Sequence, residues 1–240
     1  MLAILKKELN LFFATPIGYL VIAIFLLING LFLWVFKGDF NILNAGFADL
    51  NSFFFITPWF FIFMIPAITM RTFSDEIRLG TIEIIKTKPI STWDIIIGKY
   101  LGSLMLILLA LLPTVTYMYT VTKLAATPEN IDFGSILGSC FGLLFLASAI
   151  TAIGLFTSTI SNNQIVAFII GVALSFFMFY GFEAIGDIGD FGNFNIKSLG
   201  LYARFENLGR GVVDSKDLVY FLSMTFFFLY LTKLNFDHKQ

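Results

Sequence analysis

The sequence predicts an all-α membrane protein with six transmembrane helices, a short helix before the first span and a cytoplasmic helix between the second and third spans. Only 13% of the 240 residues are charged, whereas a soluble domain usually carries about 25%. Hydrophobic residues make up 58% of the chain, and the mean hydropathy is +0.88. These residues form long blocks instead of alternating with charge. Too few charged side chains remain to cover a water-exposed surface, so much of the surface must face lipid.

Six apolar blocks are long enough, or nearly long enough, to cross a bilayer. A hydrocarbon core about 30 Å thick takes roughly 20 residues of helix. The expected spans are residues 17–36, 53–70, 101–122, 135–160, 165–182 and 218–232. None of them contains a charged residue. A helix satisfies its own backbone hydrogen bonds, as lipid requires, so residues 1–240 are expected to form one helical membrane domain.

The basic residues between the second and third spans set the orientation. This loop holds five lysines and arginines, whereas each of the two flanking loops holds one. Basic residues accumulate in short cytoplasmic loops, so both ends of the chain are expected in the cytoplasm, with the spans in an inner membrane. Residues 183–217, between the fifth and sixth spans, are then expected to form an external loop.

Residues 1–15 are expected to form an amphipathic helix along the cytoplasmic interface. Apolar residues recur there at helical spacing, at Leu2, Leu5, Leu9, Phe12 and Phe13. Lys6, Lys7 and Asn10 lie elsewhere on the helical wheel, an arrangement typical of helices that lie in the plane of the membrane surface. The residue before a proline disfavours helical geometry, so the helix is expected to end near Thr15.

The segment 71–100 holds most of the polar residues on the cytoplasmic side. One helical face is shared by Ile77, Thr81, Ile84 and Ile85. Gly80 would allow close approach of a neighbouring backbone. Pro89 would end this helix, and Ser91 would cap the next one. A short amphipathic helix of this kind can dock in a groove of a soluble partner, or it can be a solvated connector without a partner, and the pattern leaves both open.

A longer motif in this segment points to a family. The string E-x-x-x-G-T-x-E, followed by a proline and then by Gly-Lys at the next span, occurs at Glu76, Gly80, Thr81, Glu83, Pro89, Gly98 and Lys99. In this motif the chain resembles the ABC-2 family of ATP-binding-cassette transporter permeases. The six spans, the N-terminal helix and the long last external loop match that family too, so the resemblance covers essentially the whole chain. Residues 52–59, residues 210–223 and the phenylalanine-rich spans resemble its gliding-motility-associated permeases from Bacteroidetes.

The resemblance implies an exporter built from two permease chains, identical or paralogous, and two ATPase chains that bind ATP and magnesium. Residues 74–88 would then be the coupling helix, seated in a cleft of the ATPase, and its movement would switch the pathway between inward and outward access. The residues expected at this surface are Glu76, Gly80, Thr81, Glu83, Pro89 and Lys99, with Glu76 and Glu83 as polar contacts. The N-terminal helix would add a second contact through Lys6, Lys7 and Glu8.

Other function classes lack their residues in this sequence. Gly98-Lys99 is not a nucleotide-binding loop, because Trp93 stands where the first glycine would be and Tyr100 follows the lysine. The only histidine, His238, lies in the C-terminal tail. With charge-free spans, this argues against a membrane hydrolase and an ion-coupled carrier. No catalytic residue, metal site or bound cofactor is expected, and the net charge of −1 argues against nucleic-acid binding.

Three questions stay open at the level of sequence. The polar residues inside the spans, Asn29, Ser148, Thr151 and Ser175, either line a pathway or pack helices together. The carboxylates of Glu183, Asp187 and Asp190 match no known calcium cage in their spacing. The chain is either a transporting subunit or a non-transporting membrane scaffold that recruits a partner to motility or secretion machinery.

Overall fold

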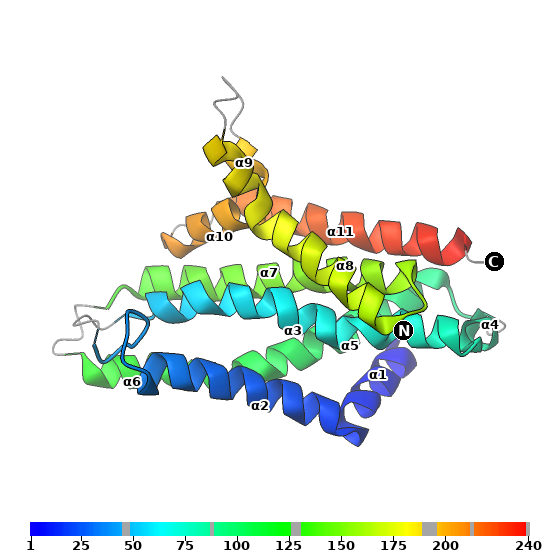
Figure 1. Ribbon diagram of the computed structural model, residues 1–240, viewed down its shortest axis with the longest axis horizontal. Helices are drawn as coiled ribbons and strands as arrows, with labels where there is room; N and C mark the ends of the chain where they lie inside the picture. Colours follow the sequence, from blue (N-terminus) through cyan, green and yellow to red (C-terminus); the bar gives the residue numbers. More distant parts are fainter. Residues whose placement is uncertain (45–48, 87–88, 126–130, 189–195, 212–213, 239–240) are drawn as a thin grey trace.

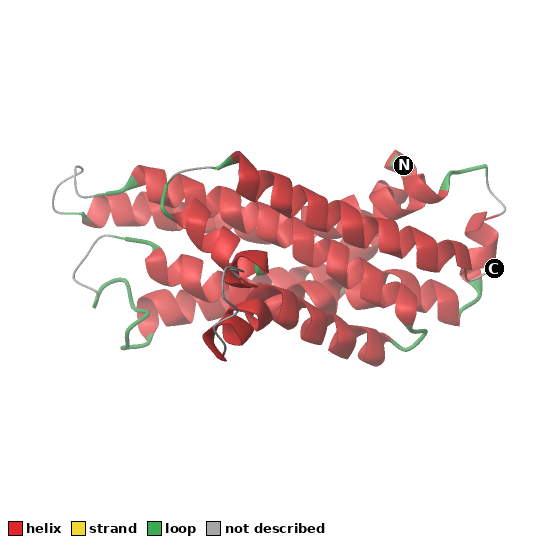
Figure 2. Cartoon of the chain, turned by 90° about the horizontal axis from the view of Figure 1, so that it is seen from above, coloured by secondary structure: helices red, strands yellow, loops and turns green. Residues whose placement is uncertain are grey.

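The structure is helical throughout the part of the chain that it describes. The computed structural model describes residues 1–44, 49–86, 89–125, 131–188, 196–211 and 214–238, and every regular element among them is a helix (Figure 2). Six helical stretches are long and apolar enough to span a membrane: Pro16–Val35, Asn51–Arg78, Thr92–Leu124, Phe133–Ile160, Gln164–Ile188 and Ser215–His238. The predicted fold class is therefore confirmed.

The first two helices are separated at a proline, as the sequence predicts. Helix α1 (Leu2–Ala14) ends before Thr15, whose extended backbone has φ −109° and ψ 156°. Pro16 then opens α2 (Pro16–Gly30), where its fixed φ suits the first helical position. Helix α2 continues into a π-helical turn, η1 (Leu31–Val35). Because of the break at Thr15, α1 leaves the axis of α2 at a marked angle (Figure 1).

Helix α3 (Asn51–Arg78) extends well past the predicted span. Its 28 residues make a helix of about 42 Å, longer than the hydrocarbon core. The last turns of α3 were expected to belong to a separate cytoplasmic helix of residues 74–88, and this expectation is wrong. The helix ends at Arg78, Gly80 adopts a positive φ of 69°, and the short α4 (Thr81–Lys86) begins in a new direction.

The third span is one helical path made of three pieces. Helix α5 (Thr92–Leu111) passes through a 3-10 turn, η2 (Leu112–Thr114), into α6 (Val115–Leu124). The predicted cap is confirmed, because the Ser91 side chain accepts a hydrogen bond of 3.1 Å from the backbone N–H of Asp94. Pro113 lies in the 3-10 turn, where it cannot donate a helical hydrogen bond.

Helix α7 (Phe133–Ile160) is the central element, and α3, α8 (Gln164–Phe176) and α11 (Ser215–His238) pack against it. Its glycines allow close approach of neighbours. A Cβ atom on Gly154 would lie 2.2 Å from Oγ1 of Thr69 in α3, and one on Gly138 would lie 2.1 Å from the Leu208 carbonyl oxygen. Small residues of this kind are what tight helix packing in a membrane requires.

The segment 183–217, expected to be a loop, contains helices. After α8 and the π-helical turn η4 (Phe177–Gly181) come α9 (Phe182–Ile188), η5 (Ile196–Leu199) and α10 (Leu201–Gly209). Helix α10 buries Leu201, Phe205 and Leu208 and packs against α7. Its apolar stripe is too short to stand out among the Gly, Asp and Asn residues around it. Helix α11 is also longer at both ends than the predicted span 218–232.

The long helices run lengthwise beside one another, while α8 and α9 cross them and diverge from the bundle (Figure 1). Both termini and α4 lie toward the same end, the right-hand end of Figure 1, called the α4 end below. Helices α6 and α10 lie toward the opposite end. The α4 end therefore gathers the residues that the sequence selected as a candidate site.

Candidate functional site

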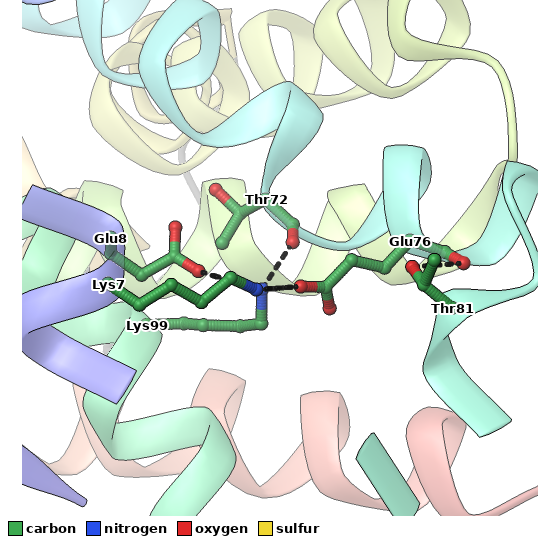
Figure 3. Close-up of polar contacts among 6 residues, drawn as sticks. All are labelled: Lys7, Glu8, Thr72, Glu76, Thr81 and Lys99. Carbon is green, nitrogen blue, oxygen red and sulfur yellow. Dashed lines mark hydrogen bonds and ion pairs between the residues drawn. The ribbon is translucent and has the colours of Figure 1, made fainter. Parts of the chain in front are cut away.

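Four charged side chains form one cluster that joins α1, α3 and α5 at the α4 end (Figure 3). Nζ of Lys99 lies 3.1 Å from Oε1 of Glu8 and 2.9 Å from Oε1 of Glu76. It also donates a 2.7 Å hydrogen bond to the carbonyl oxygen of Thr72. Nζ of Lys7 lies 2.8 Å from the same Glu76 oxygen. Lys7, Glu8, Glu76 and Lys99 are called the ion-pair cluster below.

Because the cluster is buried, its charges must be paired with one another. Lys99 is 1% exposed and Glu8 is 4% exposed, so neither charge is stabilised by bulk water. A buried ammonium needs a partner for each of its three N–H bonds, and Lys99 finds them in Glu8, Glu76 and Thr72. Two cations and two carboxylates leave the cluster with no net charge. Its members come from three helices, so it fastens those helices together.

Lys7 keeps its charge at physiological pH. Burial alone would lower the pKa of Lys7, but its hydrogen bond to Glu76 and the charges of Glu76 and Glu8 outweigh burial and raise that pKa. A raised lysine pKa contributes stability that is complete below the ordinary value of 10.5 and is lost only as the pH rises above it. The link between α1 and α3 is therefore insensitive to Lys7 titration at neutral pH.

Two glycines explain why α1 lies directly against α5. A Cβ atom on Gly98 would lie 2.9 Å from Cβ of Ile4, and one on Gly102 would lie 2.7 Å from Cβ of Glu8. The glycines are one helical turn apart and flank Lys99, so they form a groove that admits α1. The sequence pattern pointed α1 toward a lipid surface, whereas Glu8 and Phe12 are buried against protein.

The predicted coupling residues fall into two groups. Glu76 and Lys99 belong to the ion-pair cluster, and Thr81 donates a 3.4 Å hydrogen bond to the carbonyl oxygen of Glu76, which ties the first residue of α4 to α3. Glu83 and Pro89 are exposed, as is Lys6 on α1. The structure therefore brings Lys7, Glu8, Glu76 and Lys99 together and leaves the exposed three apart from them.

Gly80 turns the chain where α3 ends. No atom of this chain lies within 4 Å of the position that a Cβ atom on Gly80 would take, so no other part of this chain approaches closely there. Its φ of 69° lies in the left-handed region, which glycine adopts without steric cost. Gly80 thus turns the chain between α3 and α4, which removes the single helical face expected from Ile77 to Ile85. The side chains of residues 84–88 lie outside the described part.

Further polar contacts anchor the elements around α4, and local sequence gave no sign of them. Gln164, at the start of α8, donates a hydrogen bond to Asp75, and Nη2 of Arg78 lies 3.0 Å from Oδ1 of the same aspartate. At the start of α5, Thr92 donates a 3.1 Å hydrogen bond to Asp237 near the end of α11. Gln164 and Asp75 lie 89 positions apart in the sequence, and Thr92 and Asp237 lie 145 positions apart. Only the fold brings the two members of each pair together.

Other residues singled out from the sequence are held within the chain. Nζ of Lys197 lies 3.4 Å from Oε1 of Glu183 and also pairs with Asp187, so both carboxylates are bound to an ammonium group. Asp190 lies outside the described residues. Among the described residues no group of three His, Cys, Asp or Glu side chains is placed to hold a metal. Oγ of Ser148 in α7 lies 2.6 Å from the hydroxyl oxygen of Tyr100 in α5, so the two hydroxyls share a hydrogen bond.

Of the remaining polar residues in the spans, Asn29 and Thr151 bond to carbonyl oxygens one turn earlier in their own helices. Ser175 is fully buried in α8. The hydrogen bonds of Ser148, Asn29 and Thr151 lie between or within helices of this chain, whereas Oδ1 of Asn29 and Oγ of Ser175 are buried without a partner.

Comparison with known proteins gives a match to one family model. A family model described as ABC-2 family transporter protein matches residues 40–197, more than half of the chain. The match includes α3, α4, α5 and their connections, and thus two of the four residues of the ion-pair cluster. A search of curated proteins found no match.

Proposed function

Because the chain belongs to the ABC-2 family of transporter proteins, we propose that this permease forms the membrane-spanning half of an ATP-driven exporter whose ATPase is a separate chain. The six apolar helical stretches supply a membrane domain, and the sequence has no nucleotide-binding loop. ATP and magnesium would accordingly bind to the partner ATPase, and this chain would convert the movement of that partner into a change of access across the membrane.

The proposal rests on the way in which α4 is connected to α3 at the end of the bundle. This helix lies beyond the long helices at the end that also holds both termini (Figure 1). It follows directly on α3 through Gly80, and Thr81 bonds back to Glu76. A short helix that projects from a bundle on a fixed base is suited to a groove of a soluble partner. We place α4 in such a groove of the ATPase, with the exposed Glu83 as its polar contact.

Glu76 then has a supporting task instead of a contact with the partner. Its carboxylate is committed to Lys99 and Lys7, and its carbonyl oxygen holds α4 through Thr81. A push on α4 would reach Glu76 first. From there it would pass along α3, which continues without a break into the membrane, and through Lys99 into α5. Tilting of α3 and α5 together would switch the pathway between inward and outward access.

Helix α1 is proposed as the second contact with the ATPase. Lys6 is exposed and Lys7 is about half exposed, with 48% of its side chain accessible. Glu8 faces inward and fastens the helix to Lys99. The helix would therefore present its lysines to an acidic surface of the partner while Glu8 keeps it in register with α5.

The cellular assignment rests on the sequence resemblance. Residues 52–59 and 210–223 support membership of the gliding-motility group, with the F subunit of the Gld transporter as the proposed counterpart. A second permease chain, identical or paralogous, would complete the exporter. The position of both termini at the α4 end agrees with an inner-membrane orientation in which both lie in the cytoplasm (Figure 1).

The test is an affinity purification of the tagged full chain in mild detergent, followed by an assay of ATPase activity in the eluate. We expect ATPase activity to co-purify, and the variant Glu83→Lys to lose at least about 90% of it, because charge reversal removes a polar contact and adds repulsion. Glu206→Lys makes the same charge change at an exposed residue of the opposite end and should keep the activity.

Two outcomes would contradict the proposal in different ways. A homogeneous, folded protein without any ATPase partner would favour the non-transporting scaffold. Full ATPase recovery with Glu83→Lys would retain the transporter but remove α4 as its coupling surface.

A further inference from the structure

Arg71, near the cytoplasmic end of α3, has no carboxylate within ion-pair distance among the described residues, and the charges of Asp75 and Glu8 act on it only from farther away. Lys7 and Lys99 are balanced by Glu8 and Glu76 in the ion-pair cluster, and Arg78 is paired with Asp75. Within the described part of the chain, Arg71 makes no ion pair and no hydrogen bond. Its guanidinium lies over the ring of Phe12, 5.1 Å from the centroid. The pairing of its neighbours therefore leaves Arg71 without a carboxylate of its own.

The guanidinium lines a cavity between α1 and α3 with a volume of about 430 Å³. Leu11, Phe12 and Thr15 contribute to its wall from the side of α1 and its connection to α2. Thr72 lines the cavity as well and is 5% exposed, yet its hydroxyl has no hydrogen-bond partner. A buried hydroxyl without a partner is costly, so the cavity offers an unused donor beside an unused cation.

The chemistry of these groups selects an anion with several oxygen atoms. A guanidinium presents a planar fork of N–H donors that matches phosphate in a bidentate manner. Phe12 covers one face of the guanidinium and leaves the donors along its edge available. The Thr72 hydroxyl can supply a further donor. Oε1 of Glu76 is paired with Lys7 and Lys99, while its Oε2 has no hydrogen-bond partner and can accept a hydrogen bond from a hydroxyl of the headgroup.

The position in the membrane indicates where the phosphate comes from. The apolar stretch of α3 ends at Met70, so Arg71 lies at the edge of the hydrocarbon core, at the level of lipid headgroups. Leu11 lines the cavity with 46% of its surface exposed. This exposed apolar side chain would contact an acyl chain.

We propose that this cavity binds the phosphate of an anionic membrane phospholipid, with Arg71 as the bidentate donor and Thr72 as the second donor. Because Arg71 makes no ion pair, it can pair with the phosphate of a lipid of net charge −1, such as phosphatidylglycerol. The bound lipid would lie between α1 and α3 beside the ion-pair cluster, and it would brace the helix pair that the cluster joins. This assignment does not depend on the proposal that the chain is part of an exporter.

The test is native mass spectrometry of the purified full chain, titrated in a neutral detergent with phosphatidylglycerol or with phosphatidylethanolamine. We expect one phosphatidylglycerol to be retained per chain in preference to phosphatidylethanolamine. Arg71→Gln should weaken that binding about tenfold or more, which corresponds to about 1.4 kcal/mol. Lys6→Gln is the matched control, because it removes one positive charge from the exposed side of α1, outside the cavity, and should leave binding unchanged.

A second variant keeps the test valid if Arg71→Gln fails to fold. Leu11→Trp fills the mouth of the cavity from an exposed position and leaves Arg71 in place. It should also reduce phosphatidylglycerol binding. Unchanged affinity in both variants, or an equal loss in Lys6→Gln, would overturn the proposal. Displacement of the lipid by millimolar inorganic phosphate would identify a free-phosphate site and would likewise overturn the lipid assignment.

Discussion

At the scale of single residues, Lys99 shows how a membrane protein accommodates a charge near its apolar core. The ammonium is 1% exposed, and burying it alone would be prohibitive. Two carboxylates and a carbonyl oxygen replace the lost water, while the ring of Phe73 lies 4.9 Å from Nζ. Such an arrangement contributes less to net stability than to defining which helices must lie together.

Removal of Lys99 should therefore be severe, because Lys99→Met leaves the buried Glu8 with only the more distant Lys7, whose Nζ lies 3.9 Å from Oε1 of Glu8. We expect a loss of about 3–5 kcal/mol in the free energy of unfolding, the usual cost of breaking a buried ion pair. The change is measured as a lower midpoint of thermal unfolding in detergent. The triple variant Lys99→Met, Glu8→Gln and Glu76→Gln removes the charges together and should recover most of the loss. Equal destabilisation in both variants would argue that packing, not charge, explains the effect.

At the scale of helices, the position of α1 depends on the absence of side chains at two glycines of α5. Gly98 and Gly102 leave a groove in α5, and Ile4 and Glu8 of α1 lie in it. The ion-pair cluster then sets the register of α1 within that groove. Gly80 plays the complementary part at the end of α3, where its positive φ redirects the chain into α4. Three glycines thus position the two elements proposed to face the ATPase.

Gly102→Ala should loosen α1, since its new Cβ would lie 2.7 Å from Cβ of Glu8. Overpacking of this kind typically costs about 1–3 kcal/mol. We expect amide hydrogen exchange in residues 2–14 to become about tenfold faster. Gly30→Ala is the matched control, because no atom lies within 4 Å of the corresponding Cβ position in α2. Unaltered protection of α1 in Gly102→Ala would show that the groove is wider than its geometry indicates.

At the scale of the whole molecule, burial is shared unevenly among the six spans. In Pro16–Val35 and Gln164–Ile188 only 22% of the most apolar window is buried within the chain, against 67% in Phe133–Ile160. The central helix therefore already has its neighbours, whereas the first and fifth spans present apolar faces. Lipid or a second permease chain must cover those faces.

The position of both termini and α4 at one end makes the orientation testable. In a Cys140→Ser background, Glu83→Cys should react with a membrane-impermeant thiol reagent in inverted vesicles and not in intact spheroplasts. Asp39→Cys, exposed between α2 and α3, should show the reverse. The reason is that cytoplasmic loops collect basic residues, and the connection around α4 is the richest in them. Labelling of both positions from the same side would refute the six-span topology.

The number and approximate place of the spans followed from the sequence alone, because lipid imposes a local rule: a run of apolar residues long enough to cross must be a helix. The end of α1 before Pro16 and the cap at Ser91 were equally local. The tertiary structure alone decided that Glu8 meets Lys99 across 91 positions, that Glu76 faces inward and that no described carboxylate lies within ion-pair distance of Arg71. Ion pairs form between side chains that packing brings together, and packing depends on the shapes of whole helices. No local pattern records which charge a distant helix will cover.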